Sequence, residues 1–152
     1  MTKAPRNKAT TASYVVLRKN EQILLARRCN TGYQDGNYQV PAGHLDAGEL
    51  PSEALIREVK EEIGISIKPE HIHFAHTVFR PKIDETGDRV DYYFTVDTWE
   101  GDVTNCEPEK CDDLLWCTID KLPQNTTPHV RIALKAIARG EYYSEINLNQ
   151  LQ

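Results

Sequence analysis

The sequence predicts one α/β sandwich. Apolar, β-rich runs precede, separate and follow two segments with helical spacing, and no internal repeat or long linker divides the 152-residue chain. A chain of this length suits a single domain with a substantial core. We expect a flexible N-terminal lead-in over residues 1–12, one domain over 13–145 and a C-terminal tail over 146–152.

Short runs rich in apolar and β-branched residues predict the strands. Two pairs of these runs are each joined by a polar segment, which is typical of antiparallel hairpins. The polar loop GDVTNCEPEKCDD precedes the last run. The predicted strands cover residues 13–19, 22–28, 71–79, 89–99 and 114–119.

Two segments predict helices, and each has recognisable ends. In the first, residues 50–64, Pro51 suits the first turn and Gly64 suits the end. In the second, residues 128–140, apolar side chains recur at helical spacing and Gly140 acts as the stop.

The composition and net charge limit the classes of partner that the protein can have. Hydrophobic residues make up 39% of the chain and charged residues 27%, which is ordinary for a soluble globular protein. The formal net charge of −5 argues against broad attraction to nucleic acid or to an anionic membrane. A bound divalent metal can reverse the local sign of charge, so a nucleotide substrate remains open.

The sequence also indicates a compartment. No stretch approaches the roughly 20 apolar residues that a transmembrane helix needs, and the polar N-terminus does not look like a signal peptide. The four cysteines include no CxxC pair, so we expect reduced thiols. These features favour a cytoplasmic protein.

The segment REVKEEIG, residues 57–64, carries the most informative charges. At a helical step of about 100° per residue, Glu58, Glu61 and Glu62 fall within one arc of roughly 100°. An apolar stripe adjoins that arc, so the helix can bury one side and present three carboxylates beside it. Such oxygen-rich clusters suit Mg²⁺ or Mn²⁺, although the geometry alone leaves an ordinary solvated surface open.

A longer pattern surrounds these glutamates. From Gly43 to Ile65 the chain reads Gly, five residues, Glu, seven residues, Arg-Glu, an aliphatic residue, any residue, Glu-Glu, any residue, Gly and an aliphatic residue. In these nine specified positions the chain resembles the Nudix hydrolases. The resemblance implies an α/β/α sandwich whose mixed sheet is flanked by helices. It also implies a loop–helix–loop that binds Mg²⁺ or Mn²⁺ and the pyrophosphate of a substrate.

The resemblance also assigns roles to individual residues. It implies that the metal ligands are Gly43, through its carbonyl, and Glu58, Glu61 and Glu62. Arg57 is expected to orient a neighbouring glutamate by ion pairing, with Glu49 as its partner. Glu58 is the first choice for the general base that accepts the proton of the attacking water.

Many Nudix enzymes use a further acidic residue from a downstream loop as a metal ligand or as the base. The segment NCEPEKCDD, residues 105–113, stands where that loop is expected. Glu109 is favoured over Glu107 for this catalytic and metal-binding role. An exposed acidic loop without a catalytic role is the alternative for either residue.

The substrate is less well defined. EPEK followed by LLW is similar to the MutT-type branch, which hydrolyses nucleoside triphosphates, and their modified relatives, to monophosphates and pyrophosphate. Tyr38 and Ala42 depart from that branch, where tryptophan and a second glycine are common. Pro81, sixteen residues after Ile65, resembles a marker of ADP-ribose-cleaving enzymes, with an ordinary turn proline as the alternative.

Several side chains could contact the substrate. Arg27 or Arg80 could bind phosphates. The candidates for base stacking are Tyr33, Tyr38, Phe79, Tyr92 and Phe94, although strand alternation makes most of them core residues. We expect an enzyme, monomeric or homodimeric, that acts on a small nucleotide and has no stable nucleic-acid or membrane partner. ADP-ribose or nucleotide-sugar cleavage is the first alternative, and a non-catalytic nucleotide-binding module is the second.

Overall fold

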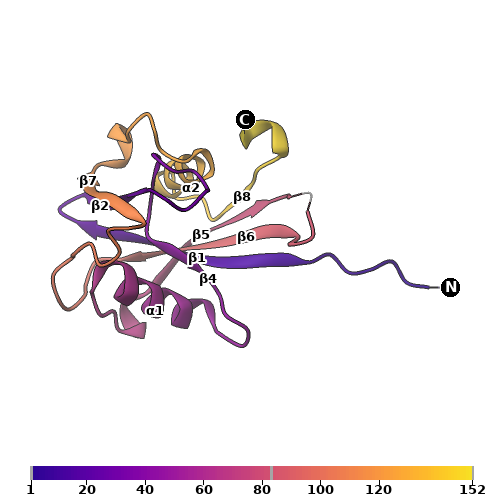
Figure 1. The fold of residues 1–152 in the computed structure, drawn as a ribbon, viewed down its shortest axis with the longest axis horizontal. Coiled ribbons are helices and arrows are strands. Elements are labelled where there is room, and N and C mark those ends of the chain that lie inside the picture. The colour runs from indigo at the N-terminus through magenta and orange to yellow at the C-terminus, as the bar shows by residue number, and fades with distance from the viewer. Residues whose placement is uncertain (1, 83, 152) are drawn as a thin grey trace.

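A mixed sheet lies between two helices, which confirms the predicted α/β fold (Figure 1). The computed structural model describes residues 2–82 and 84–151. The helices of this part are α1 (Pro51–Ile63) and α2 (Pro128–Ala138), with short 3-10 helices at Pro69–His71, Ile119–Lys121 and Leu148–Leu151. The strands are β1 (Ala9–Lys19), β2 (Gln22–Arg28), β3 (Tyr38–Gln39), β4 (Ala42–His44), β5 (His73–Arg80), β6 (Asp88–Val96), β7 (Cys111–Cys117) and β8 (Tyr143–Glu145). Within these described residues, no helix combines the length and hydropathy needed to cross a membrane.

The sheet is built around β1. This strand runs parallel to β6 and antiparallel to β2 and β4. Beyond it, β5 pairs antiparallel with β6 and parallel with β8, while β2 pairs antiparallel with β3 and β7. Both predicted hairpins, β1–β2 and β5–β6, are therefore confirmed.

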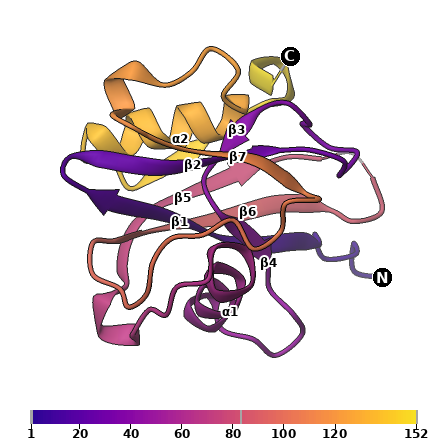
Figure 2. The ribbon, with the colours of Figure 1, turned by 60° about the vertical axis from the view of Figure 1, so that its left-hand side comes forward.

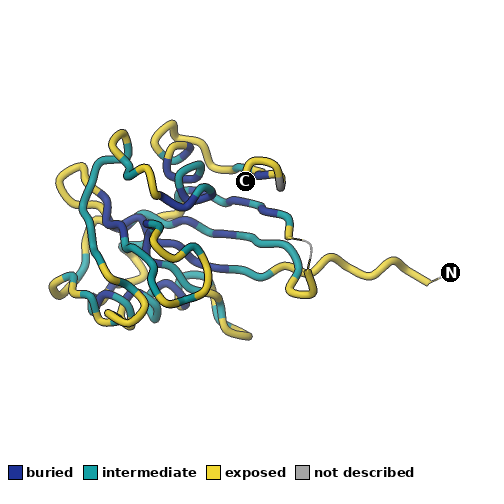
Figure 3. The backbone as a smooth tube through the Cα atoms, turned by 45° about the horizontal axis from the view of Figure 1, so that its top comes forward, coloured by how far each residue is buried: buried dark blue, intermediate teal, exposed yellow. Residues whose placement is uncertain are grey.

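Alternation along β1 divides the core into two layers. Val15 and Leu17 belong to the layer that α1 covers, whereas Tyr14 and Val16 belong to the layer that α2 covers. The two helices therefore lie on opposite sides of β1 (Figure 2), and the buried residues concentrate along the strands between them (Figure 3). Burying one such aliphatic side chain stabilises the fold by about 1.5–3 kcal/mol.

The ends of α1 follow the predicted signals. Pro51 occupies the first turn, and the Leu50 N–H donates to Glu53 Oε1 at 2.9 Å. Gly64 ends the helix with a positive φ of 74°, a conformation that glycine adopts at little cost. The Ser13 hydroxyl on β1 donates to the Pro51 carbonyl at 2.7 Å, which ties the start of the helix to the central strand.

Ordered contacts extend beyond residues 13–145 at both ends of the expected domain. β1 begins at Ala9 because residues 9–12 of the expected lead-in pair with residues 88–91 of β6. At the other end, Ile146 of the expected tail is only 1% exposed, and its N–H donates to the Phe79 carbonyl. These long-range contacts carry no local sequence signal. Residues 2–6 are exposed and extend away from the sheet (Figure 1).

Candidate active site

A glycine lets the middle of α1 approach the sheet closely. Gly43 lies on β4, opposite Ser13 of β1. A Cβ atom at Gly43 would overlap the carboxyl group of Glu58. The missing side chain therefore makes the space in which the Glu58 carboxylate lies against the strand.

Four carboxylates line one cavity of about 310 Å³, which we call the acidic cavity. Three of them, Glu58, Glu61 and Glu62, come from α1, as the helical arc predicts. The fourth is Glu107, from the loop before β7. Arg27 and other residues of β2 also line this cavity.

Arg57 connects the carboxylates at the edge of this cavity. Its Nε and Nη2 atoms donate to the two oxygens of Glu49 at 2.8 and 2.9 Å, and its Nη1 donates to Glu58 Oε1 at 2.7 Å. Nη2 also contacts the His44 carbonyl at 3.2 Å. The guanidinium is therefore fixed on one side by Glu49 and orients Glu58 on the other.

Glu62 lies where negative charge is least well compensated. Burial, together with the charges of Glu58 and Glu107, raises the pKa of Glu62 well above its ordinary range. A cation between these carboxylates would relieve both effects.

The loop before β7 is fixed to the end of α1. The Cys106 N–H donates to the Glu62 carbonyl at 3.0 Å, and the Asn105 side chain accepts from the Glu107 N–H at 3.1 Å. Asn105 Nδ2 also donates to the Cys111 carbonyl at 2.7 Å. These contacts place Glu107 beside Glu62.

The expected loop carboxylate, Glu109, lies elsewhere. It is exposed and does not line the acidic cavity, whereas Glu107 does. The N–H groups of Lys110 and Cys111 both donate to the Glu107 carbonyl, so the chain turns and Glu109 falls on the outside. The structure thus places Glu107, and not the preferred Glu109, in the lining of the acidic cavity.

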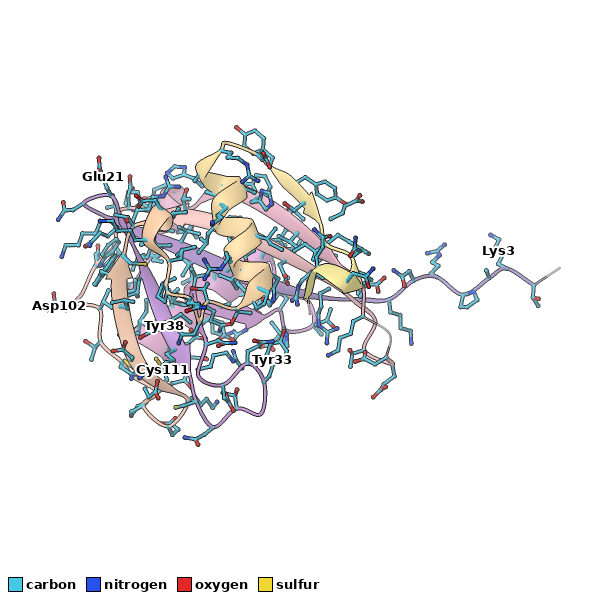
Figure 4. The ribbon with its side chains drawn as sticks, turned by 90° about the horizontal axis from the view of Figure 1, so that it is seen from above. Lys3, Glu21, Tyr33, Tyr38, Asp102 and Cys111 are labelled. Carbon is cyan, nitrogen blue, oxygen red and sulfur yellow. The ribbon has the colours of Figure 1, made fainter. Side chains whose placement is uncertain are left out.

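A second cavity of about 670 Å³, the basic cavity, adjoins the first and shares Arg28 and Gln39 with it. Among the described residues its lining contains no aspartate or glutamate. Tyr14 and Tyr33 line it, and the Arg28 guanidinium lies 5.5 Å from the centre of the Tyr33 ring. Its cationic residues are Arg28, Arg80, Lys82 and Arg89. Tyr33 and the acidic-cavity residue Cys111 lie on the same side of the molecule (Figure 4).

The pattern of the NUDIX domain matches residues 7–139. The chain belongs to the Nudix family. Members of this family are pyrophosphohydrolases and generally need divalent metal ions. The predicted family and enzyme class are therefore confirmed.

Individual Nudix proteins are similar over most of the chain. The 8-oxo-dGTP diphosphatase of Escherichia coli (strain K12) is 27% identical over 118 residues, which are 75% of this chain and 87% of that protein. The ADP-ribose pyrophosphatase of Methanocaldococcus jannaschii is 26% identical over 117 residues, 77% of this chain and 66% of that protein. The crystal structure of a MutT Nudix hydrolase from Burkholderia pseudomallei covers 84% of this chain and 97% of its own, with a TM-score of 0.75 and 25% identity.

The residues that line the acidic cavity of this Nudix chain fit a divalent metal in their chemistry. The donor set is rich in carboxylate oxygens, as Mg²⁺ and Mn²⁺ prefer, and Gly43 lets the Glu58 carboxylate lie against β4. Within residues 2–82 and 84–151, no three His, Cys, Asp or Glu side chains already surround one point. Arg57 pairs with Glu58 and lies 3.7 Å from Glu61.

Three of the other sequence candidates line one of the two cavities, whereas Phe79, Tyr92 and Phe94 line neither. Arg27 lines the acidic cavity, and Arg80 and Tyr33 line the basic cavity. Tyr38 is buried, and its hydroxyl donates to Asp113, so it is part of the core. Sequence reasoning missed Arg28, whose place at the end of a predicted strand gave no hint that two cavities meet there.

The ion pair between Arg57 and Glu49 gives this Nudix site a predictable pH dependence. Hydrogen bonds from Arg57 and from the Asp46 N–H lower the pKa of Glu49 from 4.5 to about 2. A lowered folded-state pKa stabilises the fold above about pH 4.5, and this contribution is lost as the pH falls towards 2. We expect Glu49→Gln to lower the free energy of unfolding at pH 6, with a difference from wild type that vanishes near pH 2.

Urea unfolding of both proteins between pH 6 and pH 2 measures this difference. Glu70→Gln, at an exposed position, is the control and should show no such trend. A difference between wild type and Glu49→Gln that stays constant with pH would contradict the ion-pair assignment.

Proposed function

We propose that the chain is a Mg²⁺- or Mn²⁺-dependent pyrophosphohydrolase that cleaves a nucleoside triphosphate, or an oxidised relative, to monophosphate and pyrophosphate. The observation that carries this proposal is the junction of the acidic and basic cavities at Arg28. A metal-bound phosphate chain fits the first cavity, and a nucleoside fits the second, where Tyr33 offers an aromatic face.

In this proposal Glu58, Glu61 and Glu62 hold the metal together with the Gly43 carbonyl. When bound, the metal neutralises phosphate charge and lowers the pKa of coordinated water. Glu58 accepts the proton of the attacking water, and the Arg57–Glu49 pair keeps its carboxylate in place.

The remaining charged residues of the acidic cavity position the substrate. Arg27 and Arg28 line the same cavity as the glutamates, where cationic side chains can bind phosphate oxygens. Glu107 is the loop carboxylate that assists the metal or the base, because it lies beside Glu62.

ADP-ribose or a nucleotide sugar is the alternative substrate. Pro81 follows the last residue of β5 and also lines the basic cavity, so its turn role and a binding role are compatible. The similarity to an ADP-ribose pyrophosphatase supports this alternative. The triphosphate is favoured because the chain covers 87% of the 8-oxo-dGTP diphosphatase and only 66% of that relative.

A substrate screen with Mg²⁺ and with Mn²⁺ tests the proposed function. It should include nucleoside triphosphates, oxidised triphosphates, ADP-ribose, nucleotide sugars and dinucleotides, with chromatography of the products. Triphosphates should yield monophosphate and pyrophosphate. Fast ADP-ribose cleavage with inert triphosphates would favour the alternative substrate. Nucleotide binding without any turnover would favour a non-catalytic module.

Two neighbouring loop glutamates provide a matched test of the loop assignment. We expect Glu107→Gln to lower kcat about 10- to 100-fold, as is usual when a group that supports a metal site is lost. Glu109→Gln should leave kcat within about twofold, because this residue lies outside the cavity. Steady-state kinetics on the best substrate decides between the two glutamates. A larger loss of kcat in Glu109→Gln than in Glu107→Gln would support Glu109 as the functional loop carboxylate.

The wider setting is also inferred. We propose a small nucleotide as the partner, no stable nucleic-acid or membrane partner, and a cytoplasmic location. The net charge of −5 supports the second point. Whether the protein is a monomer or a homodimer stays a prediction.

A further inference from the structure

A buried arginine lies at the wall of the basic cavity. Arg80 is only 9% exposed, although it contributes to the cavity lining. Its Nε and Nη2 atoms donate to the two oxygens of the fully buried Asp91, at 2.7 and 3.2 Å. Asp91 therefore neutralises the charge of Arg80, so Arg80 offers the cavity hydrogen bonds more than net charge.

The histidine behind Arg80 limits how the guanidinium can turn. His129 Nδ1 lies 3.4 Å from Arg80 Nη1, and its ring packs edge-on against Tyr14. Burial and the nearby Arg80 charge lower the pKa of His129 to about 3, so the ring is neutral and Nδ1 can accept a hydrogen bond. Asp91 and His129 thus fix Arg80 from two sides.

Two N–H donors of Arg80 have no acceptor among residues 2–82 and 84–151. A guanidinium has five N–H donors, and these contacts use three of them. The two that remain belong to the neighbouring atoms Nη1 and Nη2, and no acceptor for them occurs among residues 2–82 and 84–151. Because Arg80 lines the basic cavity, a ligand bound there with two adjacent acceptors would complete this set of hydrogen bonds.

We propose that Arg80 determines base specificity by donating to two adjacent acceptors of the nucleobase. Guanine and hypoxanthine present such a pair in their six-position carbonyl and N7, whereas adenine has an amino donor at position six. Asp91 and His129 act as positioning residues. This inference rests on the proposed function, since it requires a nucleoside in the basic cavity.

Phosphate oxygens are the other source of paired acceptors, and the structure favours the base. Arg80 is already neutralised by Asp91, so it has little charge left for a phosphate. Arg28, which both cavities share, lies at the entrance from the acidic cavity and is better placed for the phosphate chain.

The test compares kcat/KM for GTP, ITP, 7-deaza-GTP and ATP. Wild-type protein should prefer GTP and ITP over ATP and 7-deaza-GTP by about tenfold or more. Arg80→Lys, which cannot donate in the same paired geometry, should lose this preference, and Arg139→Lys, at an exposed ion pair, should keep it. Equal use of GTP and ATP by wild type would overturn the proposal. So would an Arg80→Lys variant that keeps the preference or slows all four substrates equally.

Binding separates this inference from the proposed function. Calorimetry of metal-free wild-type protein with GMP, IMP and AMP needs neither hydrolysis nor the variant to fold. GMP and IMP that bind about tenfold more tightly than AMP would support the Arg80 assignment, even if no triphosphate is cleaved. The lack of cleavage would then refute only the proposed reaction. Equal binding of GMP and AMP refutes the Arg80 assignment even if triphosphates are cleaved.

Discussion

Replacing Glu62 by glutamine is expected to lower kcat/KM about a thousandfold or more without unfolding the protein. The proposed metal contributes several kcal/mol of transition-state stabilisation, and each 1.4 kcal/mol corresponds to about tenfold in rate. Glutamine keeps the shape of the side chain and removes the charge that Glu58 and Glu107 repel. The free energy of unfolding of the metal-free protein should therefore be unchanged or higher.

Steady-state kinetics, urea unfolding and calorimetric titration with Mn²⁺ measure the three parts of this result. Glu70→Gln, at an exposed position away from α1, is the matched control and should behave as wild type. An unchanged rate for Glu62→Gln, with unchanged Mn²⁺ affinity, would show that Glu62 does not bind the metal.

Gly43→Ala is expected to lower kcat about 100-fold or more and to destabilise the fold by about 1–3 kcal/mol. The new methyl group would overlap the carboxyl group of Glu58, so either the carboxylate or β4 must move. β4 is held by its pairing with β1, which leaves the Glu58 carboxylate to be displaced. Kinetics and thermal unfolding of the purified variant measure the two effects.

Gly140→Ala separates the loss of activity from the loss of stability. Gly140 has a positive φ of 74°, and a Cβ there would meet nothing within 4 Å. The strained backbone should cost about 1 kcal/mol, yet the variant should keep its kcat. If both variants lost activity in proportion to their stability, the contact between Gly43 and Glu58 would have no specific role.

The parts of the fold with local signals were predictable. Helix α1 has Pro51 and Gly64 at its ends and three glutamates at fixed angular spacing, and all of these follow from a short segment. The strands of the two hairpins were also predictable from neighbouring residues, because each pair of β-rich runs is joined by a polar segment.

The parts that depend on distant contacts were not predictable. The choice between Glu107 and Glu109 is made by hydrogen bonds that join the loop to the end of α1. Similarly, the sequence places Arg80 directly after a predicted strand, and only the pairing of β5 with β6 brings Asp91 to it. Sequence spacing identifies the metal-binding helix, but tertiary contacts decide what surrounds it.

Arg57 acts as an internal counter-ion for the metal-free state. Because its guanidinium already contacts Glu49, Glu58 and Glu61, part of the carboxylate repulsion is compensated before any cation arrives. The chain is therefore expected to fold without metal and to exchange its cation reversibly. Changes in free Mg²⁺ would then alter the rate of the enzyme while the amount of folded protein stays constant.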